Sequence, residues 1–198
     1  MRITKEQANE NRERVIDTAS ELFRAHGFDG IGVADVMKAA GFTHGGFYNH
    51  FDSKEALSAA ATRRAFERMA IDRERARDLA DLLTRYLSRA SRKTPARSCP
   101  AAALGADAGR QPDRVKAEFA EGIEGMIATM MQRLEAEGAT GEDMRRRALN
   151  IVTKMVGALM LARAVPDDDP LAHEILATGL DGCLAEAAPK PRTPARRR

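Results

Sequence analysis

Apolar residues recur at the spacing of an α-helix along most of this chain, and no segment alternates as a β-strand of useful length would. In the first such stretch Val15, Ala19, Leu22 and Phe23 stand at positions i, i+4, i+7 and i+8, which puts them on one side of a helix. The pattern predicts an all-α fold with an N-terminal head of three helices, a connecting fourth helix and a larger helical body.

Glycines divide the head into short helices. Gly27 is placed to end the first helix, and Gly41 to separate a second helix over residues 33–40 from a third over residues 44–50. Two short helices joined by a glycine-containing turn are typical of a helix-turn-helix, here VADVMKAAGFTHGGFYNHF. We therefore predict a helix-turn-helix within the head.

The third helix is expected to have a buried and an exposed side. Phe42, Phe47 and Phe51 are spaced to anchor it on the core of the head. The remaining surface is small and polar rather than a run of Glu and Lys, which suits insertion into the major groove of DNA. The candidate DNA-contacting residues are Thr43, His44, Gly45, Gly46, Tyr48, Asn49, His50 and, in the next helix, Lys54.

Their chemistry predicts different roles. Thr43 is a natural N-cap, and the free N–H groups of that helix start suit a phosphate oxygen. His44 is the best-placed side chain for a base edge, and the adjacent glycines Gly45 and Gly46 allow close approach and leave room for a thymine methyl group. Three further side chains can bond to phosphates: Tyr48, His50 and Lys54.

Asp52 or Ser53 is expected to cap the fourth helix.

The body is expected to contain longer helices. The predicted segments are a helix ending near Ser91, a loop over 92–98, a helix that begins at Cys99-Pro100, a helix opened by Pro112, a helix over 142–164 and a last helix before residue 188. An apolar ligand pocket would lie within this core, although the same residues could be plain core. The candidate lining residues are Leu79, Leu83, Tyr86, Cys99, Phe119, Ile123 and Met126.

Net charge alone does not indicate a nucleic-acid partner. The formal charge of +3 depends on five basic residues in the segment 189–198, and the rest of the chain has 27 basic and 29 acidic residues, a net charge of −2. That segment is rich in Pro and Arg and is expected to be a disordered tail. The two cysteines, Cys99 and Cys183, are too few for a disulfide framework, and no metal-ligand spacing is present.

No apolar run is long enough for a membrane span, and the first residues lack a signal peptide, so we expect a cytoplasmic protein without a membrane partner. No paired carboxylates, glycine-rich phosphate loop or Ser/His/Asp set stands at an interpretable spacing. We therefore expect no catalytic residue, no metal site, no cofactor and no enzymatic activity.

The head resembles that of the TetR/AcrR family of regulators. The residues that carry the resemblance are Gly27-Phe28, Val33–Met37, Ala39–Thr43, Gly46–Phe51 and Ser53–Glu55. The resemblance implies a homodimer, a palindromic operator in double-stranded DNA, and a body that binds a small-molecule effector and lowers DNA affinity. It also implies backbone contacts from Thr43, Tyr48, His50 and Lys54. The bare pair Gly45-Gly46 favours reading of DNA shape or backbone over base contacts at those positions.

The segments SCPAAALGADAGRQP and MVGALMLARAV also resemble a body type found among AcrR-like regulators. In related regulators a Cys at the start of that helix can sense electrophiles or oxidants. Cys99 has basic neighbours in sequence, which favour a thiolate, but a free Cys is more commonly a small buried residue. Both interpretations stay open.

These observations predict a ligand-responsive repressor that binds its operator as a homodimer. The two copies are expected to pair through their last two helices. A small molecule or modification of Cys99 is expected to release the repressor from the operator. The predicted domains are a DNA-binding domain (1–52), a ligand-binding and dimerisation domain (53–188) and the basic tail (189–198). The alternative is an architectural or activating DNA-binding protein without a small-molecule effector. The effector, the operator sequence and the regulated genes do not follow from the sequence.

Overall fold

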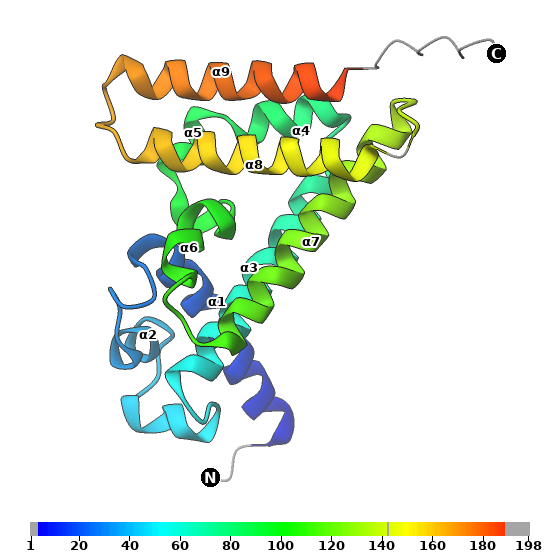
Figure 1. Cartoon of the computed structure of the whole chain (residues 1–198). Helices are drawn as coiled ribbons and strands as arrows, with labels where there is room; N and C mark the ends of the chain where they lie inside the picture. Colours follow the sequence, from blue (N-terminus) through cyan, green and yellow to red (C-terminus); the bar gives the residue numbers. More distant parts are fainter. Residues whose placement is uncertain (1–3, 142, 189–198) are drawn as a thin grey trace, which may run out of the picture. The chain divides into compact units, whose positions relative to one another are not determined.

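The computed structural model describes residues 4–141 and 143–188, and the regular structure of those residues is entirely helical, which confirms the predicted fold class. The α-helices are α1 (Lys5–His26), α2 (Val33–Ala39), α3 (Lys54–Glu74), α4 (Leu79–Tyr86), α5 (Arg89–Lys93), α6 (Pro100–Ala108), α7 (Asp113–Ala136), α8 (Met144–Arg163) and α9 (Pro170–Ala187) (Figure 1). Two short 3₁₀ helices are η1 (His44–Asn49) and η2 (Pro95–Arg97). The predicted basic tail, 189–198, lies outside the described residues.

The helices group into two compact units. The first unit runs through Arg75 and includes Arg89–Gly125; the second consists of Ala76–Ser88 and the chain from Met126 onward. Helix α7 contributes residues to both units. The predicted boundary at residue 52 separates a DNA-binding from a ligand-binding domain, whereas the two units are groups of residues in contact. The functional boundary therefore stays a prediction.

Helices α1 and α3 pack against each other in the first unit. Thr4 caps α1 because its hydroxyl accepts the Gln7 N–H at 3.1 Å, and Gly27, at a φ of +80°, ends it. Ser53 caps α3 in the same way, since its hydroxyl accepts the Ala56 N–H at 3.1 Å. Large apolar side chains buried in this unit include Phe23, Phe28, Met37, Phe47, Leu57 and Leu104.

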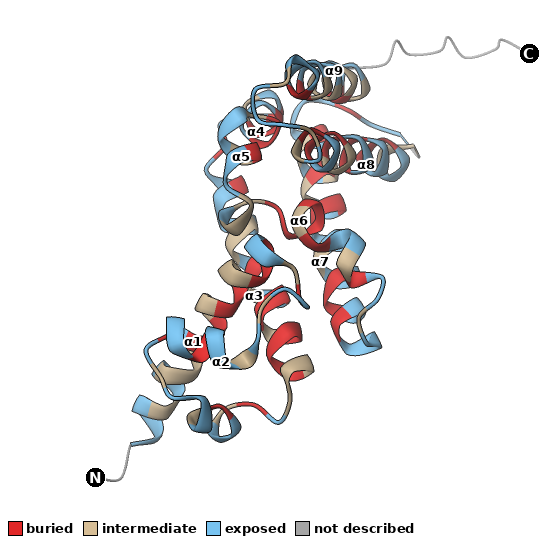
Figure 2. Cartoon of the chain, turned by 90° about the vertical axis from the view of Figure 1, so that its left-hand side faces the viewer, coloured by how far each residue is buried: buried red, intermediate tan, exposed pale blue. Residues whose placement is uncertain are grey.

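Helices α8 and α9 pack side by side in the second unit (Figure 1), and α4 lies against both. Along α8 and α9 buried and exposed residues alternate (Figure 2), as the helical periodicity of the sequence predicts. The two helices are so close at Gly179 that a Cβ built there would lie 2.5 Å from the Cβ of Ala158. Cys183 is buried in this contact, as expected of a core residue, and burial raises the pKa of its thiol to about 11.

The region between residues 79 and 98 differs from expectation. The predicted helix that ends near Ser91 is two helices, because α4 stops at Tyr86 and α5 starts at Arg89. The predicted loop over 92–98 contains the end of α5 and all of η2. Pro95 opens η2 and Pro100 opens α6, so each proline occupies a first helical turn, where its missing N–H leaves no bond unmade.

Candidate nucleic-acid interface

Helix α2 and η1 are joined by a tight turn at Gly41, whose φ of +83° lies in the left-handed region that favours glycine. The Phe42 N–H donates to the Met37 carbonyl at 2.8 Å and closes the turn. From α1, the Arg14 guanidinium donates two hydrogen bonds to the Ala40 carbonyl, at 3.2 and 3.1 Å. The structure therefore contains the helix-turn-helix arrangement predicted from the sequence.

Two aromatic residues hold η1 on the head. Phe47 and Phe51 are buried, and their rings are stacked with centroids 5.7 Å apart. Phe42, the third predicted anchor, is only half-buried, because its ring lies under the Arg14 guanidinium, 4.7 Å from the centroid, rather than in the core. Two of the three phenylalanines thus fix η1 directly.

The predicted DNA-contacting residues lie on and beside η1. Tyr48 is 70% exposed although it follows the buried Phe47, against whose ring it packs edge-on at 5.2 Å. The exposed residues are Thr43, His44, Gly45, Tyr48 and Asn49; the half-buried residues are Gly46, His50 and Lys54. The Thr43 hydroxyl makes no capping hydrogen bond, so it is available to an external acceptor or donor.

Neither glycine of the pair Gly45-Gly46 is required by the conformation of the chain. Neither has a φ in the left-handed region, and a Cβ on Gly45 would meet nothing within 4 Å. A Cβ on Gly46 would make ordinary contacts at 3.7 Å with Met37 and Thr43. No contact within the described chain therefore requires a glycine at either position.

The predicted third helix is a 3₁₀ helix. Its bonds connect residues three apart, as from the Gly46 N–H to the Thr43 carbonyl (3.0 Å) and from the His50 N–H to the Phe47 carbonyl (2.9 Å). Two adjacent glycines have the lowest helix propensity after proline, and the segment is too short for several α-helical bonds to compensate. Gly41 and the N-cap position Thr43 located this element correctly, but the sequence did not predict its type.

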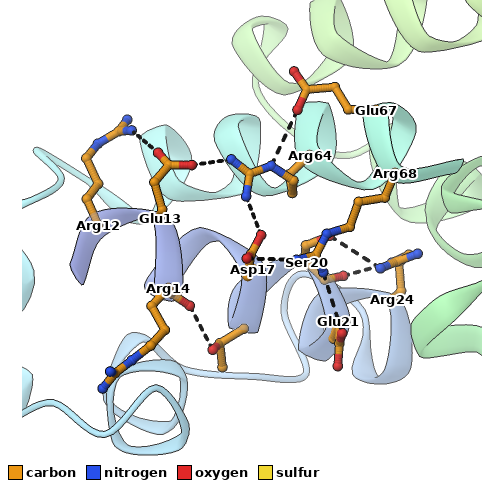
Figure 3. Close-up of polar contacts among 11 residues, drawn as sticks. Arg12, Glu13, Arg14, Asp17, Ser20, Glu21, Arg24, Arg64, Glu67 and Arg68 are labelled. Carbon is orange, nitrogen blue, oxygen red and sulfur yellow. Dashed lines mark hydrogen bonds and ion pairs between the residues drawn. The ribbon is translucent and has the colours of Figure 1, made fainter. Parts of the chain in front are cut away.

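A ladder of ion pairs joins α1 to α3 (Figure 3). Arg64 donates to the carboxylates of both Glu13 and Asp17, and Arg68 pairs with Asp17 at 2.7 Å and with Glu21 at 3.6 Å. Burial lowers the pKa of Arg64, but the hydrogen bonds that its guanidinium donates to Glu13 and Asp17 outweigh burial and raise the pKa above its ordinary value. The ladder fixes α1, which packs on the helix-turn-helix, to α3.

The sequence contains a signal for this ladder that we did not use. Glu13, Asp17 and Glu21 recur every four residues on α1, and Arg64 and Arg68 are also four residues apart on α3. Each set forms a stripe along one side of its helix. Two stripes of opposite charge and equal spacing indicate two helices that pack with these sides together.

Cys99 is 2% exposed and occupies the cap position of α6. The neighbouring Ser98 carbonyl accepts a hydrogen bond from the Arg24 guanidinium at 2.8 Å. Burial lowers the pKa of Arg24 to about 10, an effect that the negative charge of Glu21 partly offsets. Arg24 belongs to α1, so the surroundings of Cys99 are connected directly to the head.

The structure does not bring the candidate pocket residues into one unit. Leu79, Leu83, Tyr86 and Met126 belong to the second unit, whereas Cys99, Phe119 and Ile123 belong to the first. All are buried except Ile123, which is 36% exposed. Their role as pocket residues stays a prediction.

An open groove of about 300 Å³ lies between α3 and α7 in the first unit. Its apolar floor includes Phe66 and Gly122, and the ion pair of Arg63 with Glu118 lies at its edge. None of the seven candidate pocket residues lines this groove. Sequence periodicity missed it because its lining comes from two helices about 50 residues apart in the chain.

Each of the last two helices has an apolar stripe that its own unit leaves uncovered. On α8 the exposed or half-buried residues Leu149, Val156 and Met160 follow one another at helical spacing. On α9 the corresponding residues are Leu171, exposed, and Ile175, half-buried. Contiguous exposed apolar residues of this kind mark interaction surfaces.

Among residues 4–141 and 143–188, no group of three or more His, Cys, Asp or Glu residues is arranged to hold a metal ion. No helix in the same ranges is long and apolar enough to cross a membrane.

Two family profiles match this chain. Residues 15–61 match the bacterial regulatory proteins of the tetR family, and residues 74–174, about half of the chain, match the C-terminal domain of LmrA/YxaF-like transcriptional regulators. The first match contains the complete helix-turn-helix.

Curated relatives agree with these profiles. The chain is 39% identical over 56 residues to the HTH-type transcriptional regulator AcrR of Shigella flexneri, a match that spans 28% of this chain and only 26% of that protein. It is 28% identical over 170 residues to the HTH-type transcriptional regulator Rv0196 of Mycobacterium tuberculosis, which covers 81% of this chain and 88% of that protein.

Solved structures share the fold over most of the chain. The reduced form of NemR from E. coli matches with a TM-score of 0.72 and 21% identity, over 88% of this chain and 95% of NemR. A TetR transcriptional regulator from Chloroflexus aurantiacus matches with a TM-score of 0.66 and 28% identity, over 92% and 94% of the two chains. Together with the helix-turn-helix and the two matched profiles, these findings show that the chain belongs to the TetR family of transcriptional regulators, which bind DNA and are not enzymes.

Proposed function

We propose that this protein is a ligand-responsive repressor that binds a palindromic operator as a homodimer. The observation that carries the proposal is the exposed, small and polar surface of η1, held on the head by Phe47 and Phe51. Residues 1–52 are the proposed DNA-binding domain and 53–188 the proposed ligand-binding and dimerisation domain. The site of action is the cytoplasm, where bacterial operators lie.

Roles on DNA follow from what each residue exposes. Tyr48 and His50 are proposed to donate to phosphate oxygens, together with Thr43 and Lys54, and these contacts set the position of the head on the duplex. His44 and Asn49 are proposed to reach base edges. The backbone at Gly45-Gly46 approaches the groove closely, so that groove shape contributes to recognition at these positions.

Dimerisation is proposed to occur through α8 and α9. Leu149, Val156 and Met160 on α8, with Leu171 and Ile175 on α9, would be covered by the same residues of a second copy in a four-helix bundle. TetR regulators typically act as dimers. A dimer presents two copies of η1, and a palindromic operator with half-sites about 34 Å apart matches that symmetry.

Effector binding is proposed to change how well the two heads fit their half-sites. The ladder of Arg64 and Arg68 with α1 makes α3 and the head move as one body, so a ligand that displaces α3 also displaces η1. A ligand with different affinities for the two arrangements shifts their populations and lowers operator affinity. The candidate pocket residues and the groove between α3 and α7 are the places to look for it.

Modification of Cys99 is a second proposed route of release. The hydrogen bond of Arg24 to the Ser98 carbonyl lies next to the Cys99 thiol, so a bulky adduct on that sulfur would disturb the end of α1. In the assay described next, Cys99→Ser should bind operator normally and resist release by electrophiles. Release that is unchanged in this variant would contradict the route.

The experiment is a gel-shift titration of the protein on the DNA beside its own gene, with a palindromic fragment as competitor. We expect a discrete, salt-sensitive complex of dimer size. Tyr48→Ala should weaken the DNA complex by about tenfold or more, because one good contact to the DNA backbone is lost. The variant Tyr48→Phe keeps the ring, so comparing it with Tyr48→Ala separates the contribution of the hydroxyl from that of the ring. Normal affinity of Tyr48→Ala, at unchanged stability, would refute the proposed interface.

A further inference from the structure

We infer that a pocket beside the end of η1 binds a phosphoryl oxyanion. The pocket has a volume of about 170 Å³ and is formed by the loop 50–52, α1, α3 and the first turns of α7, all within the first unit. A water molecule occupies about 30 Å³ of liquid, so the pocket has room for a tetrahedral oxyanion. None of the seven candidate effector residues lines this pocket, and its lining shares only Arg63 and Glu118 with the groove between α3 and α7.

Three arginines from three helices line this pocket: Arg12 of α1, Arg63 of α3 and Arg114 of α7. Guanidinium groups present several N–H donors in a plane and are the side chains best suited to phosphate. The wall formed by α3 consists of alanines, whose small side chains leave the space open. Such a set of donors around a polar pocket favours an anion over any apolar ligand.

Two of the guanidinium groups are already held in place. Arg12 lies over the Phe51 ring, 5.0 Å from its centroid, and Arg63 donates two hydrogen bonds to Glu118, at 2.5 and 2.9 Å. Arg114 makes no ion pair or hydrogen bond with any described residue. The pocket thus has two guanidinium groups that are already oriented and a third, that of Arg114, whose donors are unused by the described residues.

The pocket keeps a net positive charge, because its lining includes three arginines and two carboxylates, Asp52 and Glu118. Arg63 and Glu118 neutralise each other, since both carboxylate oxygens of Glu118 accept hydrogen bonds from Arg63, and Arg12 pairs with Glu13 at 3.5 Å. Asp52 is exposed at the pocket and is the remaining opposing charge. Removing the Asp52 charge should therefore strengthen anion binding, whereas removing an arginine charge should weaken it.

The position of the pocket connects it with DNA binding. His50, a proposed phosphate contact, also lines the pocket. The phosphoryl group has two possible sources: a free phosphorylated small molecule, or the backbone of the bound DNA. Either source would present the same oxyanion to Arg114. Only if the phosphoryl group comes from the DNA backbone should DNA binding itself depend on Arg114.

The test measures binding of inorganic phosphate and pyrophosphate to the full chain by calorimetry, and thermal stabilisation at ionic strength matched with chloride. Arg114→Gln should weaken binding about tenfold, as expected for loss of a charge-assisted hydrogen bond, and Asp52→Asn should tighten it. Phosphate stabilises proteins generally by exclusion, so the decisive quantity is the difference between wild type and Arg114→Gln.

The matched control is Lys116→Gln, which removes a charge from the same helix outside the pocket. It should bind phosphate like the wild type. Absence of phosphate binding by the wild type, or equal binding by wild type and Arg114→Gln, would overturn the inference. This result does not depend on the operator, so it is distinct from a failure of the repressor proposal.

Gel shifts in phosphate-free buffer identify the source. If Arg114→Gln weakens the DNA complex there, the pocket binds a backbone phosphate of the duplex. If the DNA affinity is unchanged, but added phosphate alters the complex of the wild type and not that of Arg114→Gln, the pocket binds a free anion. Either result supports an oxyanion site, and a variant that equals wild type in both respects refutes it.

Discussion

Two glycines of α7, one turn apart, have opposite surroundings. A Cβ on Gly122 would lie 2.3 Å from the Phe66 ring, so α3 and α7 can approach closely only because no side chain is present. A Cβ on Gly125 would meet nothing within 4 Å. Phe66 in turn packs edge-on against Phe119 at 5.5 Å, and Phe119 against Phe28 at 6.5 Å. Gly122 thus limits how the aromatic cluster of the first unit can pack.

This contrast predicts opposite effects of the same substitution. Gly122→Ala should lower the free energy of unfolding by about 1–3 kcal/mol, as overpacking does. Gly125→Ala should raise it by about 0.5–1 kcal/mol, because alanine favours a helix. Chemical denaturation of both variants measures the difference. Equal changes in the two variants would show that α3 and α7 do not meet closely at Gly122.

Spacing along α7 could not have distinguished these two glycines. Gly122 is special because of Phe66, which lies 56 positions earlier, and a helical pattern carries no information on such a partner. The inward positions of Phe47 and Phe51, by contrast, followed from local spacing and are confirmed. Single-residue environments are predictable from sequence where they depend on the residue's own helix, and not where they depend on a second one.

Among the helical elements, α9 has its last turn secured by a side chain from α8. Arg147 is 2% exposed, and its guanidinium donates to the carbonyls of Glu186, Ala187 and Ala188 at 2.8–3.1 Å. The last carbonyls of a helix have no partner within it, and a cation at that end also interacts favourably with the helix dipole. One residue therefore completes the end of α9 and ties it to the start of α8.

Replacing Arg147 with Met keeps most of the side-chain volume and removes every donor. Arg147→Met should lower the free energy of unfolding by about 2–4 kcal/mol, because the last carbonyls of α9, among them that of the buried Ala187, lose charge-assisted hydrogen bonds. Arg146→Met is the matched control: Arg146 is exposed and its pair with Asp143 spans 3.4 Å, so the change should stay within about 0.5 kcal/mol. Thermal unfolding of the two variants is the measurement; similar losses would contradict this role of Arg147.

The existence and order of the long helices followed from sequence because apolar stripes and caps are local. Gly27 and Ser53 act as the sequence predicted, at the end of α1 and the start of α3. The short elements were less predictable: η1 has too few residues to show a period, and the break between α4 and α5 has neither Gly nor Pro to announce it. There the packing of the surrounding helices determines the backbone.

For the whole molecule, the uncovered stripes of α8 and α9 predict assembly. Met160→Lys puts a charge into the proposed interface and should raise the dimer dissociation constant by about tenfold or more. Ile71→Lys is the control, since Ile71 is an exposed apolar residue of α3 outside these stripes. Sedimentation of both variants across a range of concentrations is the measurement. A Met160→Lys protein that is as dimeric as the control would place the interface elsewhere.

Tertiary sites were the part of the molecule that sequence periodicity could not supply. Six of the seven candidate pocket residues lie on apolar stripes and Cys99 lies at a helix start, yet the seven divide between two units, and the groove and the oxyanion pocket are lined by other residues. A stripe shows which side of a helix is covered, but not which helix covers it. The candidate DNA-contacting residues are easier to propose from sequence, because one contiguous segment carries nearly all of them.

The two glycines of η1 have a consequence for how regulators of this kind diversify. Since neither backbone angles nor packing requires Gly45 or Gly46, side chains can be added there without cost to the folded head. Phe47 and Phe51 hold the segment whatever those positions carry. The residues that maintain the scaffold and the residues proposed to meet the groove are therefore different sets, and a duplicated gene could acquire a new target sequence through two codons while inheriting an intact fold.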